Sequence, residues 1–152
     1  MAGNVRFEDN LTQVIAELDV AITEYLHEIS GEFVTQTQRN TRVDQSQLKN
    51  SWQYKVDGNK STIGSPLENA IWEEFGTGEY ALEGNGRKGG WYVPEEKLTE
   101  NAKGKMRRTE VKGKVYYFTR GKTPSRAFHK AFITMKPKAI RRAEEKLKAH
   151  ME

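Results

Sequence analysis

Hydrophobic residues recur at helical spacing in the first clear segment of the chain, about residues 11–34. The apolar positions are Leu11, Val14, Ile15, Leu18, Ile22, Tyr25, Leu26, Ile29 and Phe33. Steps of three and four residues place them on one stripe of a helix, roughly 36 Å long at 1.5 Å per residue. Asn10 is a suitable N-cap, with Gln13 in capping-box spacing. The other face is acidic, and we expect it to meet solvent or a partner surface.

Shorter elements follow this helix. Residues 44–50 predict a short turn with Asp44 and Gln47 in capping-box spacing. Trp52, Tyr54 and Val56 then alternate at period two, and the turn at 57–59 predicts a hairpin whose second strand lies near 60–64. A brief helix is expected over 67–75. The next stretch, 76–90, holds six glycines in fifteen residues, which predicts an exposed, mobile loop.

The second half repeats the order of hairpin and helix. Residues 91–93 predict a short strand ended by Pro94, and residues 103–111 and 114–119 predict a second hairpin that turns near Lys112-Gly113. After Pro124, expected in the first helical turn, the period becomes helical. The stripe is Phe128, Ala131, Phe132, Met135, Ala139, Ile140, Ala143 and Leu147. Pro137 lies inside this pattern, so we expect a kink or two consecutive helices.

These elements predict an α+β fold in one domain, residues 1–152. A long N-terminal helix and a kinked C-terminal helix would pack on a small, mainly antiparallel sheet. A mobile loop near 76–90 and a basic hairpin arm near 103–119 would project from it. The chain is 36% hydrophobic and 30% charged, so we expect a modest core, no membrane span and no membrane partner. The absence of cysteine excludes disulfides and thiol catalysis.

Charge divides the chain into two halves of opposite sign. Residues 1–102 hold 9 Lys and Arg against 17 Asp and Glu, a balance of −8, whereas residues 103–152 hold 16 against 4, a balance of +12. Such a polarised subunit could pack head to tail with copies of itself and close into a ring. Alternatively, the two halves neutralise each other within one fold.

Residues with catalytic potential are few and scattered. His27, His129 and His150 lie in separate elements without metal-ligand spacing, and Glu73 and Glu74 are adjacent, so they diverge on a helix. The glycines of residues 84–89 match a dinucleotide pattern but lack its strand–turn–helix context. We therefore expect no catalytic, metal or cofactor site. The alternative enzyme would be a hydrolase or nuclease that uses Glu73, Glu74 and a histidine.

The basic hairpin supports a further alternative, binding of nucleic acid. Its cations are Lys103, Lys105, Arg107, Arg108, Lys112 and Lys114, and aromatic residues follow at 116–118. Cations beside aromatic rings can contact phosphates and stack on bases. The acidic first half opposes this reading, and we expect Arg107, Arg108, Lys112 and Lys114 to face an acidic partner surface instead.

Three segments, read in order, resemble a known family. They are Ser46-Gln47-Leu48-Lys49-Asn50-Ser51-Trp52, then Asn69-Ala70-Ile71-Trp72-Glu73-Glu74-Phe75-Gly76-Thr77-Gly78, and finally Thr123-Pro124-Ser125-Arg126-Ala127-Phe128-His129-Lys130-Ala131-Phe132. Together they are similar to the "gene-ten-like" minor tail component family of long-tailed phages, which includes tail-completion and neck proteins. The motif positions are Leu48, Ser51, Ala70, Glu74, Phe75, Gly76, Thr77, Pro124, Phe128 and Ala131. The sequence departs from the family at Asn69 and Glu73, where the family has tyrosine and an apolar residue.

The resemblance implies a structural virion protein that joins the head-proximal end of the tail to the head-side connector. It implies a ring of copies, a hexamer among the candidates, which assembles in the host cytoplasm. The implied partners are the tail terminator or tail tube and the connector, with contact to packaged DNA, and a tail-terminator or head-closure role in the same neck stays open. Locally, we expect Gly76 to adopt a left-handed conformation after a helix, Phe75 to cover the sheet, and Glu74 to bond the amides of the 76–90 loop.

Overall fold

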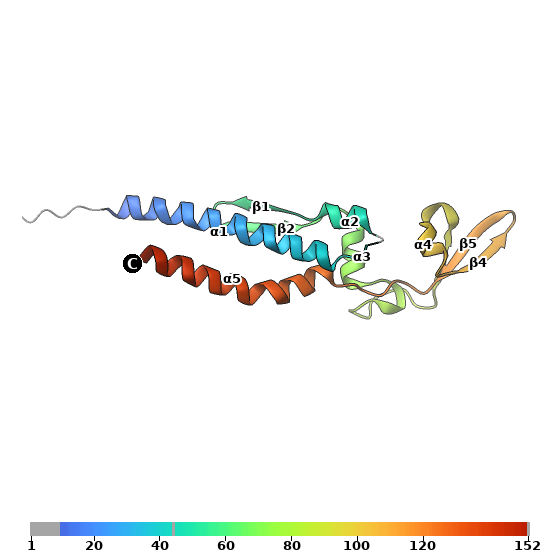
Figure 1. Cartoon of the computed structure of the whole chain (residues 1–152). Coiled ribbons are helices and arrows are strands. Elements are labelled where there is room, and N and C mark those ends of the chain that lie inside the picture. The colour runs from blue at the N-terminus through green and yellow to red at the C-terminus, as the bar shows by residue number, and fades with distance from the viewer. Residues whose placement is uncertain (1–9, 44, 152) are drawn as a thin grey trace, which may run out of the picture.

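The computed structural model describes residues 10–43 and 45–151 as an elongated molecule with most helices at one end (Figure 1). Its longer helices are α1 (Leu11–Asn40) and α5 (Ala127–Met151), and its shorter ones are α2 (Ser46–Ser51), α3 (Asn69–Phe75) and α4 (Glu100–Lys103). The strands are β1 (Gln53–Asp57), β2 (Lys60–Gly64), β3 (Trp91–Pro94), β4 (Arg107–Val111) and β5 (Lys114–Thr119). Two 3-10 turns, η1 (Gly78–Tyr80) and η2 (Glu95–Lys97), complete the order. The α+β class is confirmed.

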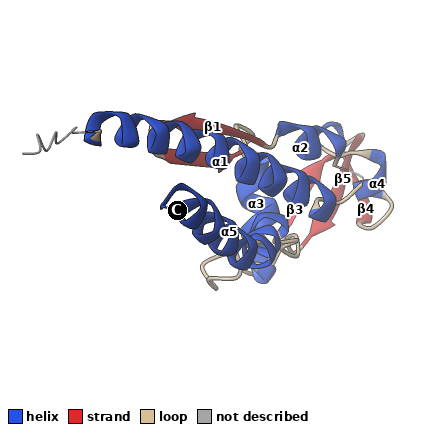
Figure 2. Ribbon diagram, turned by 60° about the vertical axis from the view of Figure 1, so that its left-hand side comes forward, coloured by secondary structure: helices blue, strands red, loops and turns tan. Residues whose placement is uncertain are grey.

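Helix α1 is the centre of the helical end. It contacts α5, both strands of the β1–β2 hairpin and α2 (Figure 2). The helix extends beyond the predicted end at Val34 because Thr37, which is fully buried, continues its inward stripe and donates its hydroxyl to the Phe33 carbonyl at 2.9 Å. A pattern of apolar residues does not include a buried threonine, so the prediction ended the helix too early. Asn10 occupies the N-cap position as predicted, but its side chain makes no capping hydrogen bond.

Two small clusters form the core, and Phe128 contacts both of them. The first contains Ile29, Phe33, Ala131 and Met135, and the second contains Leu48, Trp52 and Ala70. The Phe128 ring lies 5.1 Å from that of Phe33 and 5.7 Å from that of Trp52. Phe128 thereby joins the α1–α5 contact to α2 and α3.

The strands form two separate antiparallel sheets, so the prediction of one sheet is wrong. β1 and β2 make a two-stranded sheet on α1, and the other three strands make a sheet of order β3-β5-β4. The predicted turns at 57–59 and at Lys112-Gly113 are confirmed, and Lys112 (φ 49°) and Gly113 (φ 75°) both have the positive φ that a two-residue hairpin turn requires. Residue 103, predicted in the hairpin, belongs to α4.

Helix α5 runs as one element through Pro137, which excludes the alternative of two consecutive helices. Figure 1 shows it curved along α1. The Tyr25 hydroxyl of α1 donates to the carbonyl of Ala139 at 2.6 Å, close to the proline, and burial raises the pKa of this phenol. The predicted place of Pro124 in the first turn is wrong, because the helix begins at Ala127. Within the described residues, no helix combines the length and apolarity needed to cross a membrane.

Candidate functional site

The short helix α3 faces the molecule with its polar side and the solvent with its apolar side. Its buried residues are Ala70 and Glu73, the latter 4% exposed. Ile71, Trp72 and Phe75 lie on the other side and are about half exposed. This inversion is unusual for a surface helix. The prediction that Phe75 covers the sheet is therefore wrong.

Glu73 explains why α3 takes this orientation. Its carboxylate forms an ion pair with the ammonium of Lys122 and accepts a hydrogen bond from Nε2 of Gln45 at 2.5 Å. Its backbone carbonyl accepts the amide of Ser125 at 2.7 Å. A buried carboxylate requires such partners. Glu73 thus fastens α3 to the segment that leads into α5, so its departure from the family pattern has a structural consequence.

Glu74 caps helix α5 and does not bond the 76–90 loop, which corrects our prediction for this residue. Its two carboxylate oxygens accept the backbone amides of Phe128 at 3.0 Å and His129 at 2.9 Å. These amides lie in the first turn of the helix, where intrahelical partners are missing and the helix dipole favours a negative charge. Both acceptor atoms are engaged in this structural role.

Thr77, at the start of the glycine-rich stretch, is hydrogen-bonded to the segment that follows β5 of the β3-β5-β4 sheet. Its amide donates to the Lys122 carbonyl at 2.9 Å, and its hydroxyl accepts the Lys122 amide at 2.9 Å. The next turn repeats the connection, since the Glu79 amide donates to the Arg120 carbonyl at 2.9 Å. The two segments, about forty-five residues apart in sequence, run side by side here.

Glycines allow these two segments to approach each other. Gly76 follows α3 with φ 75°, as predicted, and a Cβ there would lie 2.8 Å from Cδ of Pro124. Gly78 is buried with φ 61°, and a Cβ would collide with the backbone of Arg120. The expectation that the whole 76–90 stretch is exposed is wrong at Gly78. Its mobility stays a prediction.

Exposed apolar side chains gather around the end of α3. We call Ile71, Trp72, Phe75 and Leu82 the α3 face; Trp72 is 49% exposed and Phe75 48%. Leu82 is held beside the helix because its amide donates to the Phe75 carbonyl at 2.9 Å. The remaining motif residues lie behind this face. Leu48 and Ala70 belong to the second core cluster, Ala131 belongs to the first, Phe128 packs against both, and the hydroxyl of Ser51 donates to the Leu48 carbonyl.

The four predicted interface cations do not share one surface. In an antiparallel sheet, directly paired residues project to the same side, and neighbours along a strand project to opposite sides. Arg107 pairs with Phe118, and Arg108 pairs with Tyr117, so the two arginines lie on opposite faces of the sheet. Lys112 lies in the turn, and Lys114 shares the face of Arg107 by the same alternation.

Reactive side chains do not converge in the described residues. No three His, Asp or Glu side chains there come close enough to hold a metal ion. Nδ1 of His27 lies 3.3 Å from the Tyr54 hydroxyl, and Nδ1 of His150 lies 2.9 Å from the Lys146 carbonyl. The partners of Glu73 and of Thr77 escaped the sequence patterns, because Lys122 and Ser125 lie outside any regular element. The one available signal was the polar residue Glu73 three positions after Ala70, on the same side of α3.

Residues 6–76 match the family model described as "Bacteriophage HK97-gp10, putative tail-component". The matched region covers the first motif segment and the second as far as Gly76, the residue that caps α3. No curated protein and no solved structure matches the chain. The resemblance to the gene-ten-like family is thus confirmed, and it indicates a structural component of a bacteriophage tail, which as a part of the virion contacts other virion proteins.

Proposed function

We propose that this phage tail component occupies the neck, where a ring of its copies joins the head-proximal end of the tail to the head-side connector. It would act by binding and not by catalysis. The observation that carries the proposal is the α3 face, an exposed apolar surface that lies within and directly beside the region matched by the family model.

The α3 face has the properties of a protein-binding surface. Clustered aromatic and aliphatic side chains are typical of the centre of protein interfaces, and monomeric proteins rarely expose them together. Glu73 and Glu74 hold the helix from beneath through backbone amides, Gln45 and Lys122. A surface fixed in this way loses little conformational entropy on binding. We assign it to contact with the tail terminator or the tail tube.

The accessible area of the chain supports assembly into a larger structure. It is 11421 Å² for 17.4 kDa, whereas a compact monomer of this mass exposes about 7,900 Å². This elongated chain thus has ample surface for contacts with two neighbours, each of which requires about 800 Å² on one partner.

Glu74 supports the non-catalytic reading. Because both of its oxygens accept amides of α5, the carboxylate is not directed toward a substrate. If the protein were a hydrolase or nuclease, Glu74→Gln would abolish a metal-dependent turnover. We expect no such turnover in either variant.

The test is complementation of the gene deletion in the phage that carries it. Deletion should give full heads and unjoined tails in electron micrographs of the lysate, and the wild-type gene should restore virions. Trp72→Ser/Phe75→Ser should fail to restore them although the protein stays folded. Ile140→Ser, a change of an equally exposed apolar residue on α5, is the matched control and should complement. Normal virions from the deletion phage would rule the proposal out, and abnormal tail lengths would favour the tail terminator.

Nucleic-acid binding is the second candidate, because aromatic and basic side chains share one open face of the β3-β5-β4 sheet. A ring around the DNA path could use this face to contact packaged DNA. The corresponding result would be micromolar binding of single-stranded or duplex oligonucleotides in a gel shift, with a steep dependence on salt.

A further inference from the structure

Two surfaces of the chain remain uncovered at its opposite ends, and they match each other in chemistry. We propose that the open face of the β3-β5-β4 sheet docks into a groove on α1 of a second copy, head to tail. This inference rests on the proposed ring, for which it names the two contacting surfaces.

The first surface, the sheet face, is aromatic and basic. It consists of Tyr92, Arg107, Lys114, Tyr116 and Phe118, which the ladder register places on one side of the sheet. The rings of Tyr92 and Phe118 are 5.3 Å apart in an edge-to-face pair, and Tyr92 is 58% exposed. Arg107 pairs directly with Phe118, so its side chain projects from the same side of the sheet as this aromatic pair.

The opposite side of the same sheet is covered in part, over the middle of β5. It carries Tyr117, which is 7% exposed, and Val93, its direct cross-strand partner on β3. Strand β5 contacts η2, and α4 follows η2 in the chain. Arg108 on this side forms an ion pair with Glu110 at 3.5 Å. The cover lies over Tyr117, whereas the outer part of this side, at Arg108 and Glu110, stays exposed but is occupied by their own ion pair.

The second surface, the α1 groove, is apolar and acidic. It is an open hollow of about 480 Å³ lined by Ala16, Glu17, Val20, Ala21, Glu24 and His150. A smaller hollow of about 270 Å³ continues it past Asp19 and Thr23. Val20 lines both hollows and is 58% exposed. Among the described residues no Lys or Arg lines either hollow, and Lys146 of α5 is paired with Glu28 at 3.4 Å.

One contact would satisfy both surfaces. The Tyr92–Phe118 pair supplies rings of a size that fits the hollow over Val20, while Arg107 and Lys114 would stand opposite Glu17 and Glu24. Aromatic residues and arginine at the centre, with opposite charges around them, are typical of specific protein interfaces.

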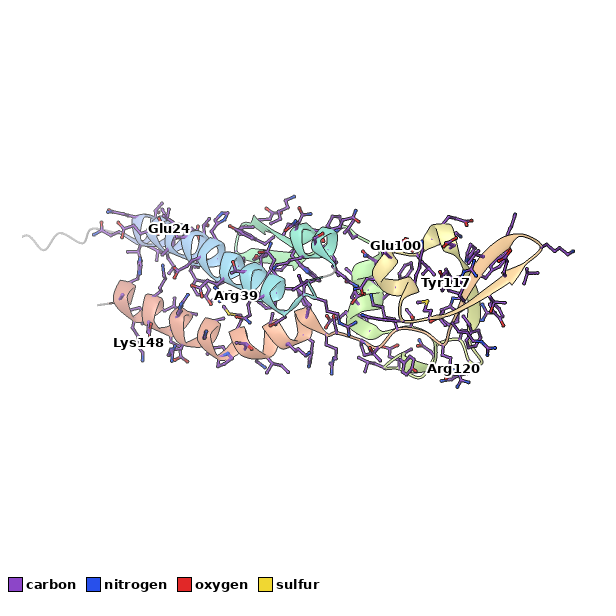
Figure 3. All side chains as sticks on the ribbon, turned by 45° about the vertical axis from the view of Figure 1, so that its right-hand side comes forward. Glu24, Arg39, Glu100, Tyr117, Arg120 and Lys148 are labelled. Atoms are coloured by element: carbon purple, nitrogen blue, oxygen red, sulfur yellow. The ribbon has the colours of Figure 1, made fainter. Side chains whose placement is uncertain are left out.

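Geometry requires that the partner be another molecule. Glu24 and Lys148 lie at one end of the chain, and Glu100 and Tyr117 lie at the other (Figure 3). The two surfaces therefore cannot meet within one copy, and a contact between unlike patches of identical subunits is heterologous and can close a ring. Nucleic acid would cover the sheet face alone, and phosphates would be repelled by the α1 groove, which would stay uncovered.

Paired charge reversal tests the docking. Arg107→Glu/Lys114→Glu gives a chain with two acidic surfaces, and Glu17→Lys/Glu24→Lys gives a chain with two basic ones. Each variant alone should self-associate at least tenfold more weakly than the wild type in sedimentation velocity at low salt. Their equimolar mixture should recover the wild-type mass, because unlike copies can alternate. Arg108→Glu/Lys112→Glu, the same charge change in the same hairpin but off the sheet face, should leave the mass unchanged.

A cysteine pair provides an independent readout, since the chain has no cysteine of its own. Val20→Cys/Tyr92→Cys should give a ladder beyond the dimer on oxidation, while each single variant should stop at the dimer.

Several results would overturn the docking. A wild-type chain that stays monomeric at every concentration, or a mixture that does not recover the mass, would exclude it, and the proposed function would survive if the gene deletion still gives unjoined heads and tails. Loss of oligonucleotide binding in the Arg107→Glu/Lys114→Glu variant alone, without any change in mass, would assign the sheet face to nucleic acid.

Discussion

The helical end and the sheet end of this chain are held together by different means. The helical end contains both core clusters and two ion-paired links from Arg142 to Glu28 and Glu32 of α1. Between residues 77 and 124, all of which the structure describes, Tyr117 is the only buried hydrophobic residue. The sheet end depends on its ladder of hydrogen bonds and on the close backbone approach at Gly78.

This difference separates two kinds of stability. Burial of apolar side chains is the dominant stabilising term in a protein core, whereas a small sheet with one buried ring is marginal without other support. The sheet end should therefore open locally at a lower free energy than the helical end. Docking on a second copy would supply the burial that the isolated chain lacks there.

Removal of a core aromatic ring should have the largest effect. Phe33→Ala deletes a ring that contacts Phe128 and Met135 across α1 and α5, and we expect a loss of about 3–5 kcal/mol in the free energy of unfolding. Urea denaturation followed by far-ultraviolet circular dichroism measures it. Phe132→Ala, which removes a half-exposed ring on α5, should cost less than about 1 kcal/mol. Equal effects of the two substitutions would contradict the assignment of the core.

A glycine substitution should act mainly on the sheet end. Gly78→Ala introduces a Cβ into the backbone of Arg120, while Gly84→Ala has a similar φ, 68° against 61°, but no atom within 4 Å. Both substitutions place an alanine in a left-handed conformation, which lowers the free energy of unfolding by about 1–2 kcal/mol. Gly78→Ala should lower it by about 2 kcal/mol more because of the collision. Hydrogen exchange at the Glu79 amide should accelerate in Gly78→Ala while exchange in α1 stays slow. Uniform acceleration along the chain would show that the two ends open together.

Neutralisation of the Glu74 cap on α5 should have the smallest effect. Glu74→Gln keeps one acceptor for the amides of Phe128 and His129 but removes the charge, so we expect a loss of about 1 kcal/mol. Glu96→Gln, at an exposed position, should change the free energy of unfolding by less than about 0.5 kcal/mol. Thermal unfolding of the two variants side by side gives the difference. Identical melting temperatures would mean that Glu74 does not stabilise the start of α5.

Most of the local structure could be predicted from the sequence, because periodicity reports on it directly. The stripe from Leu11 to Phe33 located α1, and the alternation at Trp52, Tyr54 and Val56 located the first hairpin. The division into two sheets could not be predicted, since pairing between distant strands leaves no local pattern. The same is true of the pairing between Thr77 and Lys122, which joins two irregular segments.

The candidate site was predicted only in part. Phe75 was among the motif residues, whereas Ile71, Trp72 and Leu82 were not named as site residues, and the orientation of α3 was not foreseen. The motif indicated that Glu74, Phe75 and Gly76 act together, and only Gly76 behaves as expected. The partners of Glu73 decide which side of the seven-residue helix α3 faces inward. They are Gln45, just before α2, and Lys122, in the irregular segment before α5. Burial of the paired Glu73 carboxylate sets the orientation of α3, although it leaves three large apolar side chains exposed. A pattern of hydrophobic residues does not contain this information.

The closure at Thr77 and Lys122 has a consequence for how this molecule can change over generations. Because the chain leaves and re-enters the helical end at one point, everything beyond that point behaves as a cassette whose length hardly alters the entropy of closing the loop. Phages could lengthen, shorten or exchange the cassette, and so retune which neighbour the subunit accepts, without redesigning the helices that carry it.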